Sequence, residues 1–118
     1  MKRYIMEFGM GIDLHGQDVT NAAIKAVKNA VQFSCLCGLV EVLEIDRDYS
    51  NIYAIITIAT TKPDEIDHDK IAKALTSEAV KVEVIKGGMR MKGLKYEPFG
   101  DTDESIEVVN ACVEVFVK

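Results

Sequence analysis

The residues best suited to chemistry lie in the segment GMGIDLHG, near the start of the sequence. Gly9, Gly11 and Gly16 surround an acid and an imidazole, Asp13 and His15. Because these two are two positions apart, an extended backbone projects both side chains to the same side. A carboxylate beside an imidazole can orient the ring for general acid–base work, and the same pair can ligate a divalent metal. We predict acid–base or hydrolytic chemistry with Asp13 and His15 as catalytic residues.

Other interpretations of this segment stay open. A glycine loop between a strand and a helix is common, and in that case Asp13 accepts loop N–H groups while His15 packs or caps. The dinucleotide fingerprint is excluded, because Leu14 stands where its third glycine would be, and the P-loop is excluded because no Gly-Lys-Ser/Thr follows. Asp18 competes as a capping carboxylate with a bound phosphate, which favours a carboxylate or carbonyl ligand.

A second segment, GGMRMKG at residues 87–93, supplies positive charge. Arg90 and Lys92 are again two apart, so both cations project to one side of a glycine-framed turn. Arginine can hold a carboxylate with two parallel hydrogen bonds. We predict that Arg90 and Lys92, with the three glycines of the first segment, bind a small anionic or carbonyl ligand. The alternative is a solvated turn on an acidic protein.

The remaining reactive side chains receive no such role. We expect Glu7 to be an outward-facing strand residue and His68 to be solvated among neighbouring acids. Cys35 and Cys37 lack the Cys-x-x-Cys spacing of redox and zinc sites, which favours packing. No metal ligands are therefore assigned, and the cofactor is left unknown.

The composition excludes several classes of partner. The 118 residues carry 14 Lys and Arg against 19 Asp and Glu, a net charge of −5, without a basic cluster interleaved with aromatics. Nucleic acid and anionic membranes are therefore not expected as partners. Apolar runs are far shorter than the roughly 20 residues that span a bilayer, and an odd number of cysteines, 3, favours reduced thiols. We expect one cytoplasmic domain over residues 1–118.

Apolar periodicity predicts the elements that position these residues. A helix begins at the N-cap Asp18 and ends near Cys35, and a weaker helix lies around residues 66–75 with Asp64 or Asp67 as its cap. Residues 89–107 read as a long ordered loop of the kind that serves a site. Strands are predicted at 2–8, at 39–45 and 52–60 with a hairpin turn over 46–51, at 80–86 and at 107–117.

This order predicts a two-layer α+β plait of ferredoxin-like or chorismate-mutase-like type. Its order is β-α-β-β-α-β with an extra C-terminal strand, and right-handed crossovers place both helices on one face of the sheet. The strand at 52–60 is apolar on both faces, which two helices cannot cover. We therefore expect a homo-oligomer in which another copy covers the second face, an arrangement that can place the site between subunits.

The chain resembles a family of uncharacterised bacterial and plant proteins that carry a GxGxDxHG signature near the N-terminus. The resemblance extends over the chain, through Asn21-Ala22-Ala23, Cys37-Gly38, Gly87–Arg90 and Asn110-Ala111. It marks a site but implies no established activity. The element order is also similar, as an analogy, to chorismate-mutase-like and cyclic-imide-hydrolase-like plaits, whose ligands sit between subunits.

The sequence thus favours a small-molecule enzyme. His15 would transfer protons, Asp13 would orient its ring, loop N–H groups would stabilise developing negative charge, and Arg90 would hold the substrate. Three alternatives remain: a metal site made by Asp13 and His15, a metabolite-binding module without turnover, and a structural oligomer.

Overall fold

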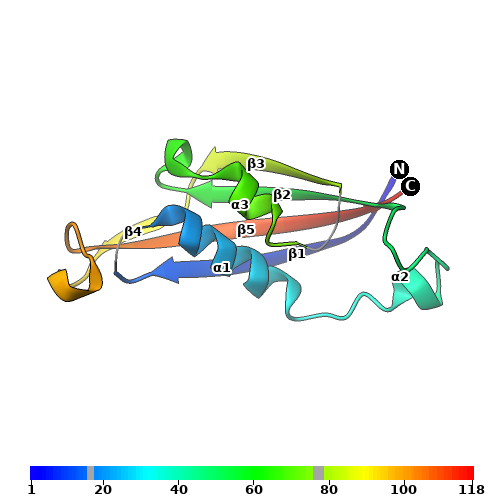
Figure 1. Cartoon of the computed structure of the whole chain (residues 1–118), viewed down its shortest axis with the longest axis horizontal. Coiled ribbons are helices and arrows are strands. Elements are labelled where there is room, and N and C mark those ends of the chain that lie inside the picture. Colours follow the sequence, from blue (N-terminus) through cyan, green and yellow to red (C-terminus); the bar gives the residue numbers. More distant parts are fainter. Residues whose placement is uncertain (16–17, 76–78) are drawn as a thin grey trace.

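The computed structural model describes residues 1–15, 18–75 and 79–118, and its centre is a mixed sheet (Figure 1). The strands lie in the order β1 (Lys2–Asp13), β5 (Ser105–Val117), β2 (Ile52–Thr60) and β3 (Val80–Lys86). β5 is antiparallel to both of its neighbours, whereas β2 and β3 are parallel. The short strand β4 (Met89–Lys92) pairs with the beginning of β5.

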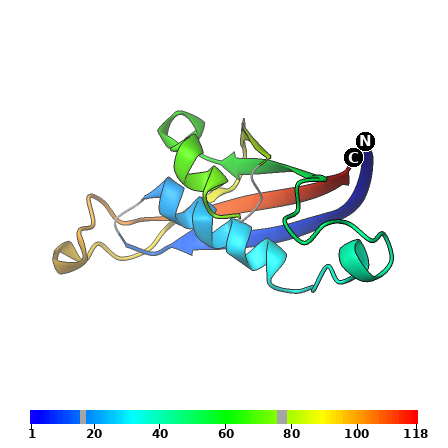
Figure 2. The ribbon, with the colours of Figure 1, turned by 45° about the vertical axis from the view of Figure 1, so that its right-hand side comes forward.

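One face of the sheet is covered by α1 (Val19–Val31) and α3 (His68–Ala72), as Figures 1 and 2 show. The predicted caps are confirmed: the Asp18 carboxylate accepts the Asn21 N–H at 3.1 Å, and Asp67 accepts the Lys70 N–H at 3.2 Å. α1 ends at Val31, four residues before the predicted end at Cys35. The two-layer α+β class with the helices on one face is thereby confirmed.

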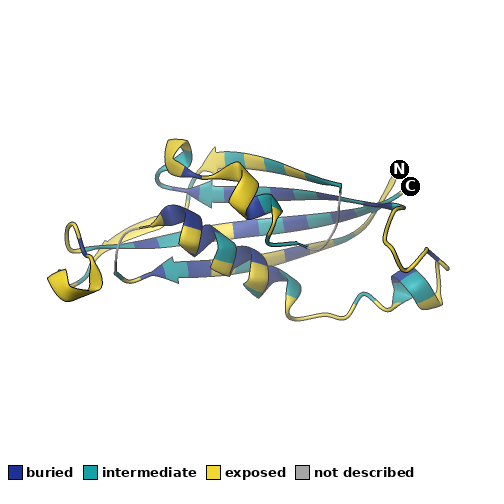
Figure 3. Ribbon diagram, viewed as in Figure 1, coloured by how far each residue is buried: buried dark blue, intermediate teal, exposed yellow. Residues whose placement is uncertain are grey.

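Strand alternation builds the core between these layers, visible as the buried stripes in Figure 3. On β2 the even-numbered residues Ile56 and Ile58 are fully buried, and on β5 the odd-numbered Val109 and Val113 face the same layer. The opposing face of α1 is made of alanines and valines, so the helix sits close to the strands. The remaining short helices are α2 (Gly38–Glu41), η1 (Pro63–Glu65) and η2 (Glu97–Phe99).

The predicted glycine loop after β1 is wrong, because Gly9 and Gly11 lie inside that strand. α1 crosses β1 at this point, and a Cβ at Gly11 would overlap the carbonyl oxygen of Ala22. A Cβ at Gly9 would likewise overlap the carbonyl oxygen of Ala26. The glycines therefore permit helix–sheet contact at backbone distance, which is a packing role.

The predicted strand at 39–45 and its hairpin are also wrong. Residues 38–41 form α2, which buries Leu39, and the following segment turns through a positive φ of 53° at Glu44 before Ile45 returns to the core. A short apolar run fits a strand or a buried helical turn equally well, so its periodicity could not decide between them. The order of the larger elements is therefore β-α-β-α-β-β-β.

The predicted loop over 89–107 is partly replaced by β4, and β5 begins at Ser105. Gly87 and Gly88 connect β3, which pairs with β2, to β4, which pairs with β5. The Gly87 N–H donates to the carbonyl oxygen of Thr60 at 2.9 Å, at the end of β2. Gly88 has a φ of 68° and lies against the Val108 carbonyl, a place that a side chain would occupy only with strain.

The face of the sheet opposite the helices carries exposed apolar side chains. They come from β1, β3 and β4, and are Met6, Phe8, Met10, Ile85, Met89 and Met91. We name this set the open face.

In the ranges that the structure describes, no helix has both the length and the apolar character to cross a membrane.

Candidate functional site

The end of β1, strand β4 and the start of β5 lie at the end of the sheet opposite the two termini (Figure 1), and these elements carry several ionisable residues. Three of them lie in one row across the strands, because Arg90 on β4 is the register partner of Glu107 on β5, and Glu107 is the partner of Asp13 on β1. Directly opposed residues project to the same face of a sheet. The row therefore faces the layer that holds the start of α1.

Glu107 is the centre of this row, with a fully buried side chain. Its Oε1 accepts from Arg90 Nε at 2.5 Å and lies 4.0 Å from Lys62 Nζ, while its Oε2 accepts from Thr61 Oγ1 at 2.6 Å. A buried carboxylate is tolerated where cations and hydroxyl donors compensate its lost hydration. Arg90 engages Glu107 through Nε, so its terminal guanidinium nitrogens stay at the half-exposed surface.

Asp13, the last residue of β1, is hydrogen-bonded to the residue that caps α1. Its Oδ2 accepts the Asp18 N–H at 2.5 Å, and Asp18 in turn caps the helix. Asp13 is buried at 5% exposure. The Asp13 carboxylate therefore joins the end of β1 to the start of α1.

The carboxylate that meets His15 is Asp101. Nδ1 of His15 lies 2.8 Å from Oδ2 of Asp101, whose side chain has no exposed surface, and the Tyr96 N–H donates to the same oxygen at 2.6 Å. The imidazole packs against Phe99 at a centroid distance of 4.9 Å, and Phe99 meets Tyr96 edge-on. His15 keeps about a third of its side chain exposed, 35%. A buried acid and an aromatic support thus orient a solvent-accessible ring.

The loop that carries Asp101 is tied to the start of β5. Ser105 donates through both its hydroxyl and its N–H to Asp103 Oδ1, and these bonds lower the pKa of the Asp103 carboxyl from its usual range. Gly100 ends η2 in the left-handed conformation, with a φ of 84°. This turn brings Asp101 back toward Tyr96 and under His15.

The predicted site residues are only partly brought together. Asp13, His15 and Arg90 share one end of the sheet, whereas Lys92 forms an exposed pair with Glu104 at 3.5 Å. Gly9 and Gly11 face α1, and Gly16 lies outside the described residues. Over the described ranges, no group of three His, Cys, Asp or Glu side chains is arranged to hold a metal ion.

Sequence reasoning missed Asp101 and Glu107. Alternation along β5 carried a signal for Glu107, because it shares a face with Val109 and Ala111 and is an acid at a core position. Glu7 has the same signal on β1, and the expectation that it points outward is wrong, since it is buried at 7% exposure. Asp101 had no comparable signal beyond its place in an acidic loop.

Known proteins resemble this chain along nearly its whole length. Residues 3–115 match the family described as conserved hypothetical protein (Lin0512_fam). A solved structure from Nostoc punctiforme PCC 73102, described as an FtsZ-like protein of unknown function, superposes with a TM-score of 0.87 at 30% identity, covering 99% of this chain and 96% of that chain. No curated protein sequence matches. The chain therefore belongs to the conserved hypothetical family Lin0512_fam.

Proposed function

We propose that this protein is a small-molecule enzyme in which His15 exchanges a proton with an anionic or carbonyl ligand. The observation that carries the proposal is the 2.8 Å contact between His15 Nδ1 and the buried carboxylate of Asp101. A carboxylate at Nδ1 fixes the ring orientation and directs exchange to Nε2. Asp101 thus takes the orienting role expected of Asp13, and Asp13 holds the end of β1 against the start of α1.

Arg90 supplies the anion-binding half of the proposed site. Its side chain is 46% exposed, so its terminal nitrogens can meet a ligand carboxylate while Nε stays on Glu107. Glu107 thereby serves as a positioning residue that fixes the direction of the guanidinium. The ligand would lie between this cation and the imidazole, at the end of the sheet where β1 and β4 flank β5.

A ligand screen with matched histidine variants tests this function. Thermal shift and NMR titration with small carboxylates and carbonyl compounds are carried out on the wild-type chain and on His15→Asn and Arg90→Met. His68→Asn is the control, because His68 lies on α3. We expect a ligand whose affinity falls at least about tenfold, roughly 1.4 kcal/mol, in both site variants and is unchanged in the control. Equal affinity in His15→Asn contradicts the proposal.

We also propose that a second copy of the chain covers the open face. The six side chains that define it are each between 41% and 67% exposed, which offers on the order of 600 Å² of apolar surface, against about 800 Å² per partner in a standard interface. The charges beside it are paired internally, Arg3 with Glu114 at 3.0 Å and Lys81 with Glu83 at 2.9 Å. Two such faces can therefore approach without strong repulsion.

Light scattering tests the self-association. The wild-type chain is expected to be an oligomer at micromolar concentration, and Phe8→Glu is expected to yield monomers. Leu94→Glu is the control, since Leu94 is 82% exposed and lies in the loop after β4. A monomeric wild type contradicts the proposal.

We also propose a reducing, cytoplasmic location. The free thiols of Cys35, Cys37 and Cys112 support it.

A further inference from the structure

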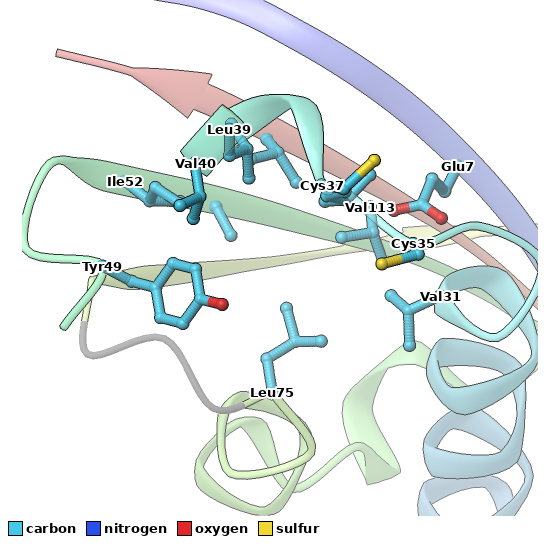
Figure 4. A pocket seen from close by; sticks show the side chains of 13 residues that line it. Glu7, Val31, Cys35, Cys37, Leu39, Val40, Tyr49, Ile52, Leu75 and Val113 are labelled. Atoms are coloured by element: carbon cyan, nitrogen blue, oxygen red, sulfur yellow. The ribbon is translucent and has the colours of Figure 1, made fainter. Parts of the chain in front are cut away.

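A cavity of about 340 Å³ lies between the helix layer and the sheet (Figure 4). Neither His15 nor Asp101 is among its lining residues. Its floor is the helix-facing side of β2 and β5, and its walls come from the end of α1, the segment around α2 and Leu75, three residues beyond α3. Most of the lining is aliphatic, including Val31, Leu39, Ile52, Leu75, Val113 and Val115.

Glu7 is the acidic side chain in this apolar wall. It is the register partner of Val113 on β5, so it faces the helix layer, and it is 7% exposed. Its Oε2 accepts from Ser34 Oγ at 2.7 Å. Among the described lysines, arginines and histidines, none lies within ion-pair distance of Glu7, in contrast to Glu107 with its two cations. A carboxylate in apolar surroundings without a counter-charge is costly, and a cation from outside would offset that cost.

The cavity is also shaped to hold an apolar body next to that charge. Figure 4 places Glu7 on one side of the cavity, with Tyr49 and Leu75 across from it. A volume of about 340 Å³ is at the lower end for small-molecule sites. Six of the thirteen lining residues lie within residues 32–51, the part of the chain that contains α2.

We propose that this cavity binds a small organic ammonium ion, whose N–H groups donate to Glu7 and whose apolar body lies against Val113, Tyr49 and Leu75. The Ser34 hydroxyl occupies one carboxylate oxygen and leaves the other for the ligand. The site is separate from the His15–Asp101 site and does not depend on the function proposed there.

The test uses three probes of one shape: 2-phenylethylamine, 2-phenylethanol and 3-phenylpropionate. Calorimetry or NMR titration of the full chain is expected to show affinity decreasing from the amine to the alcohol to the carboxylate. The amine should bind at least tenfold more tightly than the alcohol. Glu7→Gln is expected to weaken the amine at least tenfold and to leave the alcohol unchanged. Glu114→Gln is the matched control, because Glu114 lies on β5 and faces the other side, where it pairs with Arg3.

A second variant keeps the proposal testable if Glu7→Gln does not fold. Ala54 lines the cavity on β2, and Ala54→Leu fills part of it without touching the carboxylate, so amine binding should be lost. Equal affinity of amine and alcohol for the wild type overturns the proposal, as does unchanged amine binding in either cavity variant. Absence of binding by all three probes at millimolar concentration overturns it as well.

Discussion

His15 Nδ1 and Asp101 Oδ2 lie 2.8 Å apart, although 86 positions separate the two residues along the chain. The contact joins the end of β1 to the loop before β5. It makes the imidazole orientation depend on the loop, and it makes the loop conformation depend on the imidazole.

The first prediction concerns the His15 tautomer. If Asp101 accepts from Nδ1–H, the neutral ring carries its proton on Nδ1, and Asp101→Ala is expected to return the ring to a mixture of tautomers. Long-range ¹H–¹⁵N NMR of the ring nitrogens measures this. His68 is the internal control and should not change. A His15 spectrum identical in wild type and Asp101→Ala would contradict the orienting role.

The second prediction compares the two cations of β4. Arg90→Met leaves the buried Glu107 with a weaker set of partners, so we expect a loss of about 2 kcal/mol in the free energy of unfolding. Lys92→Met removes a pair whose lysine is 78% exposed, and we expect a change below about 0.5 kcal/mol. Urea unfolding of both variants measures the difference. Equal losses of unfolding free energy in Arg90→Met and Lys92→Met would show that the Arg90 guanidinium does not stabilise the buried Glu107 carboxylate.

The third prediction concerns the close approach of β1 and α1. Gly11→Ala forces a Cβ into the backbone of α1 at Ala22, and we expect a loss of about 3 kcal/mol of stability. Gly100→Asn is the control: Gly100 has open space around it, and asparagine tolerates its φ of 84°. Thermal or urea unfolding of the two variants is the measurement. A Gly11→Ala chain as stable as wild type would show that the helix can move away at little cost.

The fourth prediction concerns thiol reactivity. Burial raises the pKa of the Cys112 thiol, and the nearby Glu114 adds to this, so less of it is thiolate at mildly alkaline pH. Cys35 and Cys37 are exposed. Iodoacetamide at pH about 8 is therefore expected to alkylate these two before Cys112, as followed by peptide mass spectrometry. In guanidinium chloride, which unfolds the chain, the three thiols should be alkylated at similar rates. Alkylation of Cys112 as fast as that of Cys35 and Cys37 in the native chain would contradict the prediction.

The strands and helix caps were predictable because their signals are local. Alternation over residues 52–60 and 80–86 matches β2 and β3 at both ends, and a carboxylate before an apolar stripe located the starts of α1 and α3. The segment 39–45 failed because its apolar residues suit two conformations, and the tertiary position of Leu39 decides between them.

The contacts of the candidate site were predictable only between residues that are close together along the chain. Asp13 and His15 were found from their spacing, but the acid that meets His15 comes from a loop whose path depends on Tyr96 and Gly100. The pairing of Arg90 with Glu107 depends on the connection at Gly87–Gly88. Contacts between residues so far apart along the chain leave no periodic pattern in the sequence. They could therefore not be predicted from it.

The position of β5 at the centre of the sheet has a consequence for synthesis on the ribosome. Lys2 pairs with Val117, and β2 meets β1 through β5 alone. Until β5 has been translated, β1 lacks its strand partner and β2 is paired with β3 alone, so the apolar residues of β1 and β2 are open to chaperones or to aggregation. Closure of the sheet therefore waits for β5, and its long-range strand pairs are expected to form slowly.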